Sequence, residues 1–176
     1  MPNRIAQSVE EGGFAIVSQC LSEQMVEHLC ADLGNTKHAQ RNLLDIPIVR
    51  ELAVSEPVKE LVTACLGKEC FAVRGILFNK TPASNWKVAW HQDRTIAVRE
   101  RKNVAAFGPW SVKAGVPSAQ PPAAIMAKML AIRLHLDESH ENNGPLRVIP
   151  GSHKVGCLSM EEVAPWRERP SFTCTV

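Results

Sequence analysis

The sequence predicts an α+β chain, mostly β, in which N-terminal helices precede antiparallel strands that form a sandwich or jelly roll. Three observations predict this class. Apolar residues recur with helical spacing over residues 20–67, the spacing changes to strand-like alternation over residues 69–176, and an Asn-Gly pair at 143–144 is typical of a hairpin. A length of 176 residues fits one domain with a hydrophobic core. We therefore expect a single domain over residues 1–176.

Three helices are predicted within the first third of the chain. Ser22 is a favourable N-cap for a helix that ends at Gly34. A second, short helix begins near Pro47, because proline suits the first turn of a helix. The third is capped by Ser55 and ends at Gly67. The apolar face of the first of these helices is expected to pack against another element, most simply a sheet.

Strands are predicted where apolar and polar side chains alternate or form short apolar runs. A turn at residues 81–85 separates two of them, and a short helix is expected at residues 160–163. The segment 94–128 is rich in glycine and proline and is predicted to be an irregular insert, either a functional lid or binding loop or a poorly ordered surface excursion. The expected strands are residues 13–17, 70–78, 88–93, 129–136 and 172–176, and the Asn143-Gly144 hairpin implies one more strand that pairs with 129–136.

Composition argues against several classes of function. A formal net charge of +2 with dispersed basic residues is not typical of nucleic-acid binding. The chain has no apolar run of the ~20 residues that a membrane span needs and no signal-peptide pattern, so we expect a cytoplasmic protein. Six scattered cysteines indicate neither a zinc ribbon nor a disulfide framework. The expected partner is a small molecule, and the sequence does not indicate an oligomeric state.

His91 and Asp93 form the candidate metal motif, within Trp90-His91-Gln92-Asp93. In an extended segment, positions i and i+2 share a face, so an imidazole and a carboxylate can point at one ion. A 2-His-1-carboxylate site, which leaves positions open for oxygen and an organic co-substrate, needs one more histidine. The alternative is a histidine that is only hydrogen-bonded to the neighbouring carboxylate.

Other residues could complete such a site. His153, about 60 residues after the motif, is the candidate third ligand from the residues alone. His135 shares a strand face with Arg133 and could also approach. The guanidinium of Arg133 presents a fork of donors that matches a carboxylate, whether of a ligand or of Asp137 or Glu138 nearby.

Taken in order, three segments resemble the phytanoyl-CoA dioxygenase family of Fe(II)- and 2-oxoglutarate-dependent oxygenases. They are the His91-Gln92-Asp93 motif, the segment 129–136, and the run Asn142-Asn143-Gly144-Pro145-Leu146-Arg147-Val148-Ile149-Pro150-Gly151-Ser152-His153-Lys154. The resemblance implies a double-stranded β-helix, which is a cupin-like jelly roll, with iron held by His91 and Asp93. It places Arg133 and Ile76 beside 2-oxoglutarate, and it implies that His153 is not an iron ligand.

In that family the last histidine ligand, and an arginine for the far carboxylate of 2-oxoglutarate, follow this run. The resemblance therefore implies that the chain is C-terminally truncated and its jelly roll incomplete. We expect a dioxygenase that uses Fe(II) and 2-oxoglutarate to hydroxylate an unidentified small organic substrate, with no catalytic residue beyond the metal ligands. The alternatives are an inactive fragment or binding module with exposed strand edges, and a zinc hydrolase, for which no general base is evident.

Overall fold

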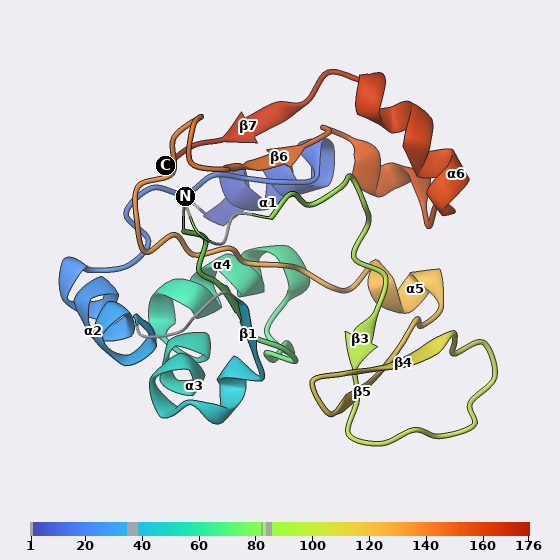
Figure 1. Cartoon of the computed structure of the whole chain (residues 1–176), viewed down its shortest axis with the longest axis horizontal. Helices are drawn as coiled ribbons and strands as arrows, with labels where there is room; N and C mark the ends of the chain where they lie inside the picture. The colour runs from blue at the N-terminus through green and yellow to red at the C-terminus, as the bar shows by residue number, and fades with distance from the viewer. Residues whose placement is uncertain (1, 35–38, 82, 84–85) are drawn as a thin grey trace.

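The computed structural model describes residues 2–34, 39–81, 83 and 86–176. Helices fill the first third of the chain and small antiparallel sheets follow, as Figure 1 shows. The mixed α/β class is confirmed, but the expectation that the chain is mostly β is wrong, because the described helices contain more residues than the described strands. Part of the turn predicted at 81–85 falls outside the described residues. Within the described ranges, no helix has the length and apolar character needed to cross a membrane.

The three predicted helices are confirmed as α2 (Glu23–Leu33), α3 (Pro47–Ala53) and α4 (Glu56–Leu66). At the start of α2 the Ser22 hydroxyl accepts a hydrogen bond from the Met25 N–H, as an N-cap should. Ser55 precedes α4, but its hydroxyl donates to the Leu52 carbonyl at the end of α3. It therefore stabilises the junction between two helices. A short 3-10 helix, η1 (Leu43–Asp45), leads into α3.

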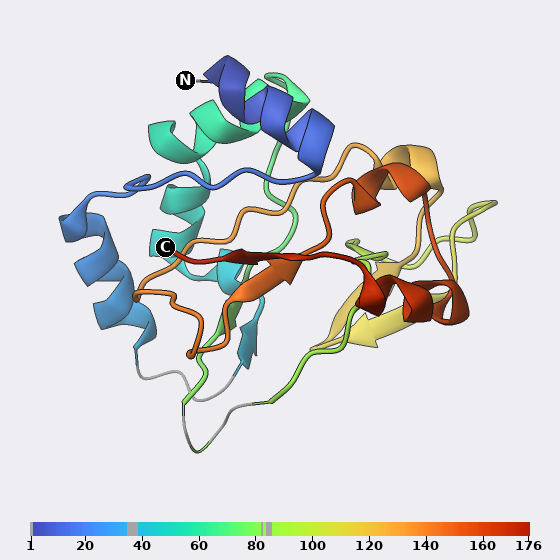
Figure 2. The same ribbon diagram turned by 90° about the horizontal axis from the view of Figure 1, so that it is seen from above.

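A helix that the sequence analysis missed, α1 (Pro2–Gly12), opens the described chain and packs against α4 (Figure 2). Its half-buried residues Ile5, Ala6 and Val9 have helical spacing, which is the signal that could have found it. The strand predicted at residues 13–17 is wrong. The chain turns at Gly13, whose φ is +86°, and runs on without a strand partner.

Among the described residues, the strands form three small antiparallel sheets rather than two large ones. The jelly roll therefore stays a prediction. The pairs are β1 (Ala39–Arg41) with β2 (Ile76–Phe78), β3 (Ile96–Ala97) with β5 (Val116–Ala119) and β5 with β4 (Trp110–Lys113), and β6 (Leu146–Val148) with β7 (Phe172–Cys174). The remaining elements are α5 (Ala123–Met126), η2 (Ser152–Val155), α6 (Met160–Val163), which confirms the helix predicted there, and η3 (Ala164–Glu168).

The prediction that residues 94–128 are irregular is wrong, because this segment contains the three-stranded sheet β3-β5-β4. Strands β4 and β5 meet at a tight turn in which Ala114 and Gly115 both have positive φ, the geometry of a two-residue hairpin. Pro117 lies within β5 and offers only its carbonyl, which accepts from the Val98 N–H. Glycine and proline therefore shape a hairpin here instead of preventing one.

The strand predicted at residues 129–136 is also wrong, although its alternation is real. The side chains of Ile132, Leu134 and Leu136 are half-buried and pack against the helical core, while Ala131 is exposed. The alternation therefore records burial on one side and not pairing in a sheet. The hairpin predicted at residues 143–144 is also wrong, because residues 129–136 form no strand and β6 pairs with β7 instead.

The C-terminal strand is confirmed as β7, and it is the partner of β6. The Ser139 N–H bonds to the Val176 carbonyl, and the Val176 N–H bonds to the Ser139 carbonyl, which joins the residues just past β7 to a residue outside β6. The strand predicted at residues 70–78 shrinks to β2. Upstream of β2 the chain is open to solvent, and the side chain of Phe71 is 84% exposed, so the prediction that this segment is buried is wrong.

The hydrophobic core lies among the helices and includes η1. Side chains from α2, α3, α4 and η1 meet there, and half-buried residues of β2 and of residues 132–136 cover it. Its buried members are Leu29, Leu33, Leu43, Leu52 and Val58.

Replacing Gly75 with alanine is expected to destabilise the fold by about 1–3 kcal/mol, because a Cβ there would overpack a tight contact. The added atom would lie 2.9 Å from the Cβ of Leu43, a core residue whose N–H bonds to the Gly75 carbonyl. Urea unfolding measures the effect. Gly12→Ala is the control, since its new Cβ meets only Phe14 at ordinary contact distance. Equal unfolding midpoints for both variants would contradict this packing.

Candidate metal centre

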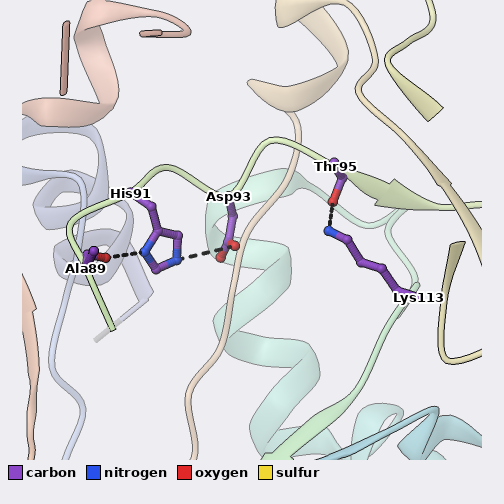
Figure 3. A network of polar contacts seen from close by, with 5 residues as sticks. All are labelled: Ala89, His91, Asp93, Thr95 and Lys113. Atoms are coloured by element: carbon purple, nitrogen blue, oxygen red, sulfur yellow. Dashed lines mark hydrogen bonds and ion pairs between the residues drawn. The ribbon is translucent and has the colours of Figure 1, made fainter. Parts of the chain in front are cut away.

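His91 and Asp93 point toward one another from an extended segment between β2 and β3, as Figure 3 shows. Nε2 of His91 lies 3.9 Å from Oδ1 of Asp93, which is too long for a hydrogen bond. Nδ1 of His91 lies 2.7 Å from the carbonyl oxygen of Ala89. A carbonyl only accepts, so the neutral ring carries its proton on Nδ1 and turns the lone pair of Nε2 to the carboxylate.

Two acceptors that face one another repel unless a positive charge lies between them. Two donor atoms that bind one ion at about 2.1 Å each can lie at most about 4.2 Å apart, and the observed 3.9 Å is within that limit. The side chains are 51% and 73% exposed, so an ion can reach them. The donor set therefore suits a divalent cation, and no hydrogen bond joins the two side chains, although they form an ion pair when the imidazole is protonated.

The strand predicted at residues 88–93 is wrong, but the predicted side-chain directions are confirmed. His91 and Asp93 are exposed, whereas Trp90, Gln92 and Arg94 are half-buried on the other side of the segment. Among the described residues, the segment has no sheet partner. Its side chains alternate because the half-buried ones bind to the C-terminal third of the chain.

These anchors are a set of polar contacts to residues 147–158. The amide of Gln92 donates to the Gly156 carbonyl at 2.8 Å and accepts from the Leu158 N–H at 2.8 Å. Arg94 donates to the Leu158 carbonyl at 2.5 Å. The guanidinium of Arg147 lies over the ring of Trp90, 5.4 Å from its centroid. Together they fix the direction in which the His91–Asp93 pair points.

The odd-numbered face continues to Thr95, whose hydroxyl accepts a hydrogen bond from the Nζ of Lys113 at 3.0 Å (Figure 3). Lys113 comes from β4, within the segment that was expected to be irregular. The ammonium group therefore lies beside the segment of the metal pair, two residues beyond Asp93. Sequence reasoning missed this contact because the two residues are 18 positions apart.

A third protein ligand is not brought to this pair by the described part of the chain. No group of three or more His, Cys, Asp or Glu side chains suited to a metal is found among those residues. His153 lies in η2, where its Nε2 is 3.0 Å from the Glu10 carbonyl of α1. Its imidazole thus joins η2 to the end of α1, and the Gly151 N–H adds a bond to the Gly12 carbonyl.

Comparison with known families assigns the chain. Its sequence matches the model of the phytanoyl-CoA dioxygenase (PhyH) family over residues 34–170, well over half of its length. The chain belongs to the phytanoyl-CoA dioxygenase family. Ectoine dioxygenase of Bordetella bronchiseptica is 25% identical over 181 aligned positions, which cover 86% of this chain and 50% of that protein. The chain therefore spans about half the length of this relative. No solved structure matches this chain, residues 1–176.

Within this member of the phytanoyl-CoA dioxygenase family, of the two residues predicted to contact 2-oxoglutarate, Ile76 lies on a strand and Arg133 lies in a segment without regular secondary structure. Ile76 begins β2 and pairs with Arg41 of β1. Arg133 is exposed and, among the described residues, forms no ion pair with Asp137 or Glu138 and no hydrogen bond with the metal pair. It lies near His135 and Cys174, and its charge adds to the burial that lowers the pKa of His135 and opposes the burial that acts on Cys174. For Cys174, burial outweighs this effect and raises the pKa of the thiol.

The protein is expected to become less stable as the pH falls, because of the environment of His135. Burial of the imidazole, with the Arg133 guanidinium beside it, lowers the pKa of His135 below its ordinary 6.5. The unfolded chain therefore takes up this proton first as the pH falls below about 6.5, and the free energy of unfolding decreases. His135→Asn should flatten that acid decrease in urea titrations from pH 7.5 downward. His28→Asn, on an exposed position of α2, should not.

Proposed function

We propose that this chain is a non-haem Fe(II)- and 2-oxoglutarate-dependent dioxygenase that hydroxylates a small organic substrate, with His91 and Asp93 as iron ligands. The observation that carries the proposal is the pair of acceptor atoms, Nε2 and Oδ1, that face one another at 3.9 Å. Membership of the phytanoyl-CoA dioxygenase family supports the reaction class. A neutral imidazole and a carboxylate are two of the three ligand types in the 2-His-1-carboxylate site of such enzymes.

The chain's own residues prepare this site for the ion. The Ala89 carbonyl holds the Nδ1 proton of His91 and so keeps Nε2 available. Asp93 contributes negative charge that favours a divalent cation, and the bonds from Gln92 to residues 156–158 hold both ligands on the exposed face. When bound, ferrous iron supplies the activation of oxygen that side chains cannot provide.

Two finer parts of the proposal rest on the family resemblance. We propose that the strands of the whole single-domain protein form a double-stranded β-helix and that a further histidine completes the ligand set. Arg133 and Ile76 are proposed to lie beside 2-oxoglutarate in that arrangement. The relative named ectoine dioxygenase supports a dioxygenase and does not identify a substrate for this chain. Neither comparison favours the binding module or inactive fragment that was the alternative.

Succinate formation tests the function. Purified protein, Fe(II), oxygen and 2-oxoglutarate are expected to yield succinate in an iron-dependent manner. Asp93→Ala should abolish this yield, because it removes one of the two ligand atoms. The control is Asp32→Ala, which removes an exposed carboxylate from α2. Succinate release that is equal in Asp93→Ala and wild type, or independent of iron, would refute the proposal.

A further inference from the structure

A cavity of about 250 Å³ lies where the end of β1 and η1 meet the sheet β3-β5-β4. Arg41, Arg74 and Lys113 line it, with Asp45 as the carboxylate among the lining side chains. The described residues contain no ion pair to any of these three cations. The described residues that line the cavity therefore carry an excess of positive charge, and no ion pair among the described residues neutralises it.

The walls of the cavity are held in place by specific contacts. Asn42 adopts a left-handed backbone conformation, and its side-chain amide donates to the Ala114 carbonyl at the β4–β5 turn, at 3.1 Å. Gly75 lies against Leu43 too closely to accept a Cβ. Ser118 of the central strand β5 lines the cavity and is 2% exposed. The cations thus border a formed cavity with a buried hydroxyl in its wall.

A residue that lines the cavity lies close in sequence to His91 and Asp93. This residue, Ala97, is four residues beyond Asp93, a separation of at most about 13 Å in extended chain. Lys113 bridges the two places, because its Nζ bonds to Thr95 while its side chain lines the cavity. A molecule of moderate length with one end in the cavity can therefore place its other end near His91 and Asp93.

We propose that this cavity binds an oxyanion, the carboxylate or phosphate group of the organic substrate, through Arg41, Arg74 and Lys113. The guanidinium fork matches the planar geometry of a carboxylate and the oxygens of a phosphate, and the Lys113 ammonium adds a point charge. The substrate class is then an anionic organic acid or organic phosphate that extends from the cavity toward the metal pair. The assignment of this class rests on the proposed function, whereas binding of the oxyanion does not require iron.

Calorimetric titration of metal-free protein with inorganic phosphate and with glutarate tests the proposal. We expect at least one of the two anions to bind, and the Arg41→Gln/Arg74→Gln double variant to weaken that binding at least tenfold. Arg4→Gln, which removes an exposed arginine from α1, is the matched control and should bind as the wild type does. Glutarate alone would assign a carboxylate, and phosphate alone would assign a phosphate ester.

The variant Asp45→Asn should change anion affinity in the opposite direction to the arginine variants. Removing the carboxylate that lines the cavity should tighten anion binding several-fold, an effect that a misfolded variant cannot produce. Absence of binding by both anions to folded wild-type protein, or equal binding by the wild type and the double variant, would overturn the proposal. His91→Ala should leave anion binding unchanged while it removes metal binding. Failure of the metal site and failure of the cavity are therefore distinguished.

Discussion

Replacing His91 with alanine is expected to lower Fe(II) affinity by at least about 100-fold and to abolish iron-dependent succinate formation. The variant loses Nε2, one of the two donor atoms that face one another at 3.9 Å. The exposed ring makes one hydrogen bond, to the Ala89 carbonyl, so the cost in stability should be small. Anaerobic titration with Fe(II), together with urea unfolding, separates the two effects.

His153→Gln is the control for this experiment, because His153 is the histidine that residue spacing alone would nominate. Its Nε2 contacts the Glu10 carbonyl of α1, and the described residues hold no group of three metal-binding side chains that includes it. We expect its Fe(II) affinity to match that of the wild type. An equal loss of affinity in both variants would assign His153 to the metal site and contradict the account.

Replacing Gln92 with leucine is expected to weaken Fe(II) binding about 10–100-fold, although Gln92 does not touch the ion. Leucine keeps a similar volume but cannot donate to the Gly156 carbonyl or accept from the Leu158 N–H. The segment that carries His91 and Asp93 would lose its main attachment to the C-terminal third. Loss of the two hydrogen bonds should lower the free energy of unfolding by about 1 kcal/mol, because the exposed Gly156 carbonyl can bond to water instead.

Gln7→Leu is the matched control, since it removes an exposed hydrogen bond to Glu11 within α1. Gln92→Glu provides a graded variant, because its carboxylate can still accept from the Leu158 N–H but cannot donate to the Gly156 carbonyl. We expect its metal affinity to lie between those of wild type and Gln92→Leu. A variant that loses stability and keeps full metal affinity would show that Gln92 is structural only.

The helices could be predicted because their signals are local. Ser22, Pro47 and Gly67 mark the ends of α2, α3 and α4 within a few residues of the apolar faces that they bound. Strand pairing is not local. The pairing of β6 with β7, between residues about 24 to 28 positions apart, and the turn of Ala114 and Gly115 depend on tertiary contacts that alternation does not encode.

The candidate site shows the same difference between local features, which the sequence predicts, and long-range contacts, which it does not. Period-two geometry correctly predicted that His91 and Asp93 share a face, and this needs only an extended backbone. The bonds from Gln92 and Arg94 to residues 156–158 span at least 64 positions, so spacing could not predict them. The contact of Lys113 with Thr95 was hidden because the glycines and prolines around β4 indicated an irregular segment.

The central claim is that His91 and Asp93 hold iron beside 2-oxoglutarate. The most direct measurement is an anaerobic titration of the protein with Fe(II) in the presence of 2-oxoglutarate, followed by its visible absorption. The account predicts the weak charge-transfer band of the ternary complex in the wild type and its loss in His91→Ala. Absence of the band in folded wild-type protein, or an unchanged band in His91→Ala, would contradict it.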